Sequence, residues 1–457
     1  MLVGPARRGT ELVMLELLGE VLERAQKAGA TAADAYVHEG QSFSAQVRLG
    51  EVETVKHARE QHLALRAFVG QSVAAVSTSD LSPDSLGRLA EDAVALARIT
   101  SPDALGGLPE ADALARLLPD LDLADADGHD LDPETKIGLA RRTEAAALEA
   151  DPRIRNSEGG EFADRRARYA YASSHGFRGE YRTSSFTLSV SPVAVQASEM
   201  QRDGWYHVAR KRARLDPPEE IGRIAARRAL RRLGARRVRT ATVPVIFDPE
   251  MAASLIRHLA GAASGPALYR GASFLLGRLG QSVASARVTI TDDGTIPGGL
   301  GSRPFDGEGL PVRRTVLVDE GVLRSYLLDT YSGRKLGLPS THHAARDGIG
   351  VSVATTNLYL AAGDTAPADL IRSVMSGLYV TELIGFGVNG VTGDYSRGAV
   401  GLWIENGELA YPVEEITIAG NLLEMFQAIE GVGNDLVFRD RTAAPTVLVG
   451  RMVVAGE

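Results

Sequence analysis

The sequence predicts an α+β protein in which two N-terminal α/β units, each an antiparallel sheet with covering helices, precede a larger β-rich C-terminal domain. The chain has 457 residues, too many for one ordinary core, and its 44% hydrophobic content can fill two or three. An N-terminal helix is followed by several short β-prone segments, and strand-like pieces dominate the sequence after about residue 240. We place the three domains at residues 1–110, 111–238 and 239–457.

The first unit begins with a predicted amphipathic helix over residues 11–29. Its apolar stripe consists of Leu12, Leu15, Leu18 and Leu22. The next segments are short and β-prone, and Gly40, Gly50 and Gly70 predict turns between antiparallel strands. A second helix over residues 82–99 is expected to cover one face of that sheet.

The middle unit follows a stretch rich in Pro, Gly and Asp, residues 101–132, which predicts a linker or a long surface crossing. A helix is expected over residues 133–150, and a strand-rich run follows, in which Tyr169 and Tyr171 occupy alternating β-prone positions. An arginine-rich helix over residues 217–234 closes the unit. Its arginines are expected to line a solvated face.

The third region contains two expected hairpins, which turn at residues 319–321 and 405–407. The glycine-rich stretch 294–309 lacks the Lys-Ser/Thr ending of a phosphate-binding loop. Because glycine lets the backbone approach a ligand closely, this stretch favours a mobile, functional loop.

Composition limits the function classes. No apolar run is long enough to span a membrane, and the first residues lack the apolar core of a signal peptide, so we expect a cytoplasmic protein. The net charge of -8 makes nucleic acid an unlikely partner in spite of the local arginines. The sequence has no cysteine, which excludes disulfides and thiolate metal ligands.

Three groups of residues are candidates for a site. A short helix over residues 248–265 carries one histidine, His258, near its middle. His342 and His343 are adjacent in a loop, where neighbours rarely bind one metal together and one of them could face a cleft. Asp394, Ser396 and Arg397 could hydrogen-bond an extended peptide, and hairpin-turn chemistry explains the same residue types equally well.

Long ordered segments carry a family resemblance. "FDGEGLPVRRTVLVDEGVLRSYLLDTYSGRKLGLPST" and the ending "PTVLVGRMVVAG" closely resemble the TldD/PmbA family, and the match extends to the N-terminal strands. "VTGDYSRGAVGLWIENGE" and "ITIAGNLLEMFQAI" are more similar to its PmbA branch, also called TldE.

The resemblance implies a heterodimeric zinc metallopeptidase that acts on short or unfolded peptides. In that family the TldD subunit carries H-E-x-x-x-H on a helix and a cysteine as third zinc ligand. Here Arg257 stands at the first histidine, His258 at the glutamate and Ala262 at the second histidine. We therefore expect no metal on this chain and a zinc ion in a TldD-like catalytic partner.

Two other function classes remain open at this point. Members of the family are also described as modulators of DNA gyrase, which would make this chain a regulatory binding protein. The chain could instead be a homodimeric hydrolase with an unrecognised site. As a peptidase subunit it would contribute His342, His343, Asp394, Ser396 and Arg397 to substrate binding.

Overall fold

The computed structural model describes residues 13–126, 128 and 130–457. Helix α1 (Val13–Ala28) confirms the first predicted helix. The first two residues of the prediction, Leu12 among them, lie outside the described part of the chain. The same is true of residues 1–12 as a whole, which were searched for a signal peptide. In the described part of the chain, no helix is long and apolar enough to cross a membrane.

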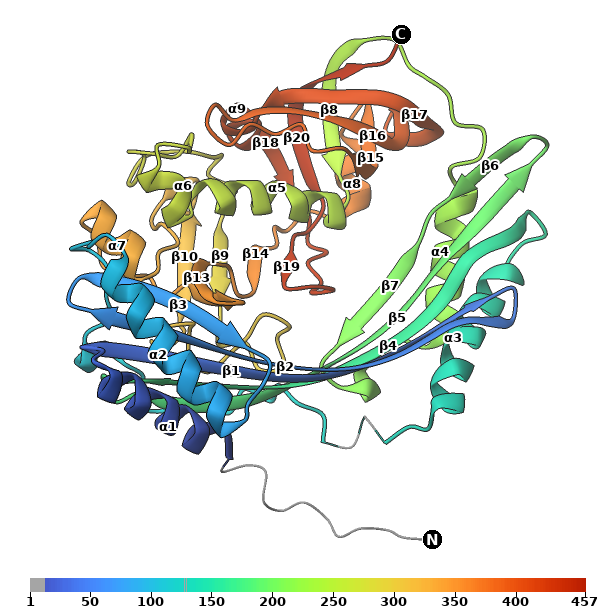
Figure 1. Cartoon of the computed structure of the whole chain (residues 1–457). Coiled ribbons are helices and arrows are strands. Elements are labelled where there is room, and N and C mark those ends of the chain that lie inside the picture. The colour runs from blue at the N-terminus through green and yellow to red at the C-terminus, as the bar shows by residue number, and fades with distance from the viewer. Residues whose placement is uncertain (1–12, 127, 129) are drawn as a thin grey trace, which may run out of the picture.

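The two N-terminal regions share one seven-stranded sheet (Figure 1). Strand β1 (Ala32–Arg48) pairs with β2 (Glu51–Val69) on one side and with β4 (Ile154–Ser173) on the other, so residues far apart in the sequence join the first and middle regions. The remaining strands are β3 (Ser72–Thr78), β5 (Arg178–Gln196), β6 (Glu199–Arg202) and β7 (Trp205–Ala209).

The predicted turn at Gly40 is wrong. Gly40 lies inside β1 and pairs with Glu60 on β2 and Ala167 on β4. A Cβ at this position would lie 2.7 Å from Oε1 of Glu60, so the glycine makes room for a neighbouring side chain and does not end the strand. The predicted turns at Gly50 and Gly70 are confirmed, and both glycines have positive φ angles.

Four helices cover one face of this sheet. They are α1, α2 (Pro83–Ile99), α3 (Pro133–Leu148) and α4 (Pro218–Leu230). Ala35 and Val37 of β1 pack under the first two helices, whereas Phe43 and Ala45 pack under the other two. Because side chains alternate across a strand, even-numbered residues of β1 point to the opposite face, where the C-terminal domain lies (Figure 1).

The described residues between 101 and 132 form the long crossing that the composition of this stretch predicts. The Tyr331 hydroxyl donates to Asp103 over 2.7 Å, and the Leu121 carbonyl accepts from the Gly298 amide over 2.7 Å. Within this segment, Asp127 and His129 lie outside the described residues. The crossing thus binds the C-terminal domain to the N-terminal sheet; it also contains a short 3-10 helix, Ala111–Ala113.

The C-terminal domain contains two larger sheets and confirms the α+β class with a β-rich end. One has the order β17-β16-β15-β8-β20-β18, and an additional pairing of β17 with β20 closes five strands into a ring. Its strands are β8 (Ala241–Phe247), β15 (Ser376–Ile384), β16 (Asp394–Glu405), β17 (Glu408–Asn421), β18 (Ile429–Val432) and β20 (Val447–Ala455).

The other sheet has the order β11-β10-β9-β14-β19. Its strands are β9 (Ile290–Asp293), β10 (Arg314–Asp319), β11 (Val322–Leu323), β14 (Leu358–Leu360) and β19 (Thr442–Ala443), and β12 (Ala344–Asp347) pairs separately with β13 (Gly350–Val353). Short helices α6 (Gly265–Tyr269), α7 (Thr330–Leu336), α8 (Pro367–Arg372) and α9 (Leu422–Gln427) connect these strands. Both predicted hairpins are confirmed, with positive φ at Glu320-Gly321 and at Asn406-Gly407.

Candidate functional site

Helix α5 (Pro249–Ala262) is the helix that carries His258. It begins at Asp248, whose side chain accepts a hydrogen bond from the Met251 amide over 2.9 Å, and Pro249 occupies the first turn. Its buried stripe, which includes Leu255 and Leu259, packs between the two C-terminal sheets (Figure 1). The helix is therefore held firmly from both sides, and its exposed residues face a cavity.

That cavity has a volume of about 380 Å³. Arg257, His258 and Ala262 line it from α5, and Arg397 lines it from β16. Phe386, in the loop after β15, is fully exposed at its edge. The structure thus brings the degenerate helix together with one of the three residues suggested from the 394–397 segment.

His258 lies in a cationic environment. Its ring meets the Tyr395 ring edge to face, with centroids 6.2 Å apart, and its Nε2 atom is buried without a hydrogen-bond partner among the described residues. Burial lowers the pKa of His258, and the charges of Arg397 and Arg257 lower it further. The imidazole is therefore neutral at neutral pH and stands beside two guanidinium groups.

These residues do not fit a zinc ion. A catalytic zinc needs three protein donors, and here one imidazole is accompanied by two permanently charged arginines and an alanine. Over residues 13–126, 128 and 130–457, no group of three His, Cys, Asp or Glu side chains could hold a metal ion. A cation placed at this helix would be repelled.

Asp394 and Ser396 lie on β16 next to Arg397, but both are exposed. Asp394 accepts hydrogen bonds from the Thr392 hydroxyl over 2.6 Å and from the Asn421 side chain over 3.4 Å. For Asp394 these bonds fit the hairpin-turn explanation of the sequence, which was the alternative to peptide binding. Arg397 instead donates to the Leu383 carbonyl over 3.1 Å, and its guanidinium reaches the cavity.

His342 and His343 lie apart from this cavity. The His343 ring is buried, with Nε2 3.1 Å from Asp292 and Nδ1 2.9 Å from the Thr341 hydroxyl. His342 is half-buried, and its Nδ1 atom donates to the Pro311 carbonyl over 2.7 Å. Burial lowers the pKa of His342. Neither histidine lines the cavity beside α5.

A second cavity, of about 540 Å³, separates the N-terminal sheet from the C-terminal domain; we call it the interdomain cleft. One wall is the face of β1, β4 and β5 opposite the four helices, and the other includes residues 300–303 and 305–307 from the glycine-rich stretch. Gly301 approaches the opposite loop so closely that a Cβ would lie 2.1 Å from the Thr356 carbonyl oxygen. The aromatic residues in its wall are Tyr36, Tyr169, Tyr171, Tyr181 and Phe305.

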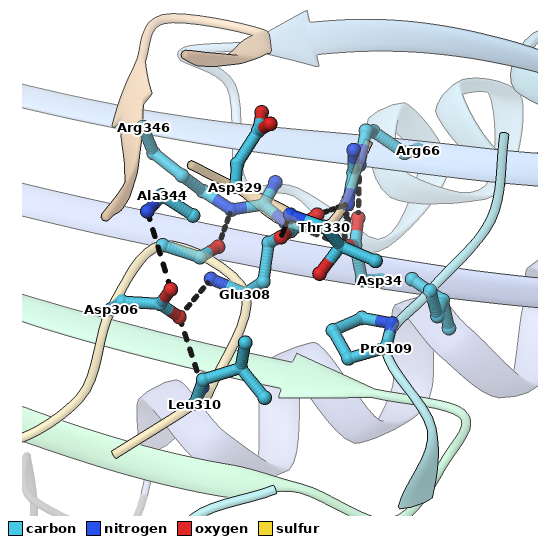
Figure 2. A network of polar contacts seen from close by, with 12 residues as sticks. Asp34, Arg66, Pro109, Asp306, Glu308, Leu310, Asp329, Thr330, Ala344 and Arg346 are labelled. Carbon is cyan, nitrogen blue, oxygen red and sulfur yellow. Dashed lines mark hydrogen bonds and ion pairs between the residues drawn. The ribbon is translucent and has the colours of Figure 1, made fainter. Parts of the chain in front are cut away.

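A buried polar network fixes this wall of the cleft (Figure 2). Arg66 donates to Asp34 through Nε over 2.9 Å, and Arg346 donates to the same carboxylate through Nη2 over 2.5 Å. The Tyr171 hydroxyl also donates to Asp34, over 3.0 Å. Burial alone would raise the pKa of Asp34, but the two guanidinium charges outweigh it and lower the pKa to about 2.

The glycine-rich stretch 294–309, which the sequence predicts as a functional loop, lines part of this cleft. Tyr169 and Tyr171 were predicted as strand residues and were assigned no site. The available signal was the alternation in β4, which places Arg165, Tyr169 and Tyr171 on one face of the sheet. The partners of these residues come from β1 and from the C-terminal domain, so the sequence pattern alone could not assemble them.

The arginines of the segment 217–234 were expected to be exposed to solvent, and only some of them are. Arg223 and Arg227 are exposed, as expected. Arg228 is largely buried and pairs with Asp203 at 3.1 Å, and Arg232 pairs with Glu382 at 2.5 Å. These two arginines hold α4 to neighbouring elements, because an arginine that leaves water needs an acidic partner.

Comparison with known proteins gives a consistent result over the whole chain. Models of the PmbA/TldA metallopeptidase domain 1, central domain and C-terminal domain match residues 33–97, 126–233 and 240–456. Metalloprotease PmbA of Escherichia coli O157:H7 is 40% identical over 425 residues, which cover 93% of this chain and 92% of the relative. A Metalloprotease PmbA homolog of Haemophilus influenzae is 38% identical and covers 99% of both chains.

Solved structures agree in fold. A protein of Bacteroides thetaiotaomicron, described as a candidate modulator of DNA gyrase, has a TM-score of 0.90 and 28% identity over 97% of this chain and 98% of that one. TldE from Thermococcus kodakarensis has a TM-score of 0.87 over 96% of this chain and 100% of that one, and at 22% identity this likeness shows the fold alone. From the three domain models and the full-length relatives together, the chain belongs to the PmbA/TldD metallopeptidase family.

Proposed function

We propose that this chain is the metal-free, PmbA/TldE-like subunit of a two-subunit metallopeptidase that processes or degrades short or unfolded peptides. The observation that carries the proposal is the cavity beside α5. Arg257 and Arg397 place two positive charges around His258, at the helix where an active relative needs zinc ligands. A TldD-like partner would supply the zinc ion and the base that activates water.

In this role the chain contributes binding surface. Phe386 is fully exposed at the edge of the cavity, where it can serve as an aromatic anchor for the partner subunit. Arg397 supports a peptide-binding role for the cavity, because its guanidinium can donate to main-chain carbonyls of an extended peptide. His342, His343, Asp394 and Ser396 have their own hydrogen bonds and are weaker candidates for such contacts.

The test uses the purified full chain, a TldD-like partner and their mixture. Metal analysis should find zinc in the partner and less than one equivalent in this chain. Cleavage of a labelled unstructured peptide should need the partner's zinc and should rise when this chain is added. Stoichiometric zinc in this chain, or cleavage by this chain alone, would favour the homodimeric hydrolase and overturn the proposal.

Residue roles are tested in the mixture. Arg397→Met should raise the KM for the peptide, because a donor in the cavity is lost, whereas Asp394→Ala should leave it unchanged. Salt-dependent binding of duplex DNA to the chain would support the regulatory alternative, since phosphate contacts weaken steeply with salt.

A further inference from the structure

We propose that the interdomain cleft binds a carboxylate group of a peptide, held by arginines of its inner wall. The inference rests on the proposed function in so far as the ligand is a peptide. The interdomain cleft is separate from the cavity beside α5, and the ligand class proposed for it is a carboxylate. Three features of the cleft support it: an excess of positive charge, guanidinium donors without acceptors, and a wall of aromatic side chains.

The cleft is strongly basic. Arginines in its wall are Arg165, Arg210, Arg303, Arg346 and Arg441, and its acidic lining residue is Asp306. Burial raises the pKa of Asp306 to about 6, and its oxygens already accept from the amides of Glu308, Leu310 and Ala344 (Figure 2). Arg165 pairs with Glu60 at 2.5 Å, and Arg346 pairs with Asp34. Arg303 lies close enough to Asp306 for its charge to lower the pKa of that carboxyl. Arg210 and Arg441 have no carboxylate within ion-pair distance among the described residues, so the wall keeps an excess of positive charge.

Two of these arginines have donors without acceptors. The Arg346 side chain is 2% exposed, and its Nη1 atom has no hydrogen-bond partner in the part of the chain that the structure describes. The Nε and Nη2 atoms of Arg303 are buried and equally unpartnered there. Buried donors are normally satisfied, so Arg303 and Arg346 keep hydrogen-bonding capacity that the described residues do not use. A carboxylate matches the planar fork of a guanidinium.

The aromatic residues add a second wall. Tyr169 stacks on Tyr181 with ring centroids 5.0 Å apart, and Tyr36 stacks on Tyr169 at 6.3 Å. Burial raises the pKa of Tyr181 to about 12, so its hydroxyl stays protonated and can donate a hydrogen bond. These rings give the cleft an apolar surface, and a lower local dielectric strengthens the attraction of the arginines for an anion.

The dimensions favour a peptide over a nucleic acid. A volume of about 540 Å³ lies in the range of ligand pockets, and the cleft runs between two packed domains. A duplex cannot enter it, and the net charge of -8 repels a polyanion from the outer surface. The carboxylate itself can be the C-terminus of the peptide or an acidic side chain, since both present the same two oxygens.

The test measures binding to the full chain by fluorescence anisotropy, without the partner and without turnover. One labelled hexapeptide of alanine and glycine is prepared as the free acid, as the C-terminal amide, and as the amide with one internal glutamate. The free acid or the glutamate peptide should bind about tenfold or more tightly than the neutral amide. Whichever of the two binds tightly identifies the source of the carboxylate.

Arg303→Met should abolish this preference, and Arg303→Lys should retain part of it, because lysine keeps the charge and loses the fork. Arg314→Met is the matched control, because Arg314 is exposed on β10 outside the cleft and its loss changes the net charge equally. Circular dichroism verifies that each variant is folded; should Arg303→Met not fold, the Arg303→Lys variant and the peptide series carry the test.

Equal affinity for all three peptides, an unchanged preference in the Arg303 variants, or tighter binding of a single-stranded oligonucleotide would overturn the inference. A different result would contradict the proposed function. If carboxylate peptides bind preferentially but this chain does not affect cleavage by the partner, the cleft assignment stands and the peptidase role is refuted. If this chain stimulates cleavage but shows no carboxylate preference, the peptidase role stands and the cleft assignment is refuted.

Discussion

Replacing Asp34 by asparagine removes the negative charge to which Arg66 and Arg346 both donate. Asp34 is fully buried in β1, and Arg346 comes from β12 in the C-terminal domain, so the substitution acts on the contact between the domains. Asparagine preserves the size of the side chain. The change therefore isolates the charge from the packing.

Two estimates give the size of the effect. Loss of one partner of a buried ion pair costs about 3–5 kcal/mol, because the remaining charge is left buried. The pKa of Asp34, lowered from an ordinary value near 4 to about 2, corresponds to roughly 2–3 kcal/mol at neutral pH. Glu308 lies 3.8 Å from Arg66 and offsets part of the loss. We expect the free energy of unfolding to fall by about 3 kcal/mol.

The pH dependence has a definite sign. The folded-state pKa of Asp34 is lowered, so its contribution is fully present above the unfolded value near 4 and is lost as pH falls through about 2. Urea unfolding, followed by circular dichroism, measures the free energy of unfolding at neutral pH and in this acid window. The difference between the wild type and Asp34→Asn should shrink as the pH falls.

A double variant is the control. Arg346→Met in the Asp34→Asn background removes the arginine left without its partner, so the double variant should be more stable than the sum of the single effects predicts. A loss below about 1 kcal/mol for Asp34→Asn at neutral pH would refute the reasoning, as would simple additivity.

Three further perturbations have expected outcomes. Burial raises the pKa of Glu308 to about 7, so the wild-type free energy of unfolding should fall as pH rises from about 4.5 to about 7, and Glu308→Gln should flatten this slope in urea titrations. Gly222→Ala would place a Cβ 2.5 Å from the Thr143 carbonyl oxygen and force α4 away from α3, which should cost about 1–3 kcal/mol in thermal unfolding. Phe386→Ser should leave unfolding unchanged and weaken association with a TldD-like partner in sedimentation velocity, whereas Leu117→Ser, at another exposed apolar side chain, should affect neither.

The sequence predicted the elements whose cause is local. The helix α5 was predicted from its amphipathic pattern, and the hairpin turn at Asn406-Gly407 followed from residues that accept positive φ. The turn predicted at Gly40 is wrong because a glycine inside a strand and a glycine in a turn look alike in the local sequence. Pairing with Glu60 and Ala167 is what places Gly40 inside a strand, and Ala167 lies far along the chain. The single N-terminal sheet was missed for the same reason.

The candidate site was predictable only in its parts. Family resemblance identified Arg257, His258 and Ala262, and these residues need only one helix to come together. Arg397 reaches the same cavity from β16, and His343 turns away to Asp292, through contacts that depend on the tertiary packing. A buried histidine with a carboxylate neighbour and a substrate-facing histidine have the same sequence signal. At His343 the buried form results, because its loop packs against β9 and brings the ring to Asp292.

The two cavities share a consequence for the division of labour in the proposed complex. Beside α5, burial and the charges of Arg397 and Arg257 lower the pKa of His258, and the two arginines repel a cation that would activate water there. In the interdomain cleft, Arg303 and Arg346 offer donors that suit an anion. Both sites therefore attract negative or electron-rich groups, such as carboxylates and main-chain carbonyls. In the proposed complex, such a chain would hold a peptide in position, and a second subunit would supply the metal within reach of the bound peptide.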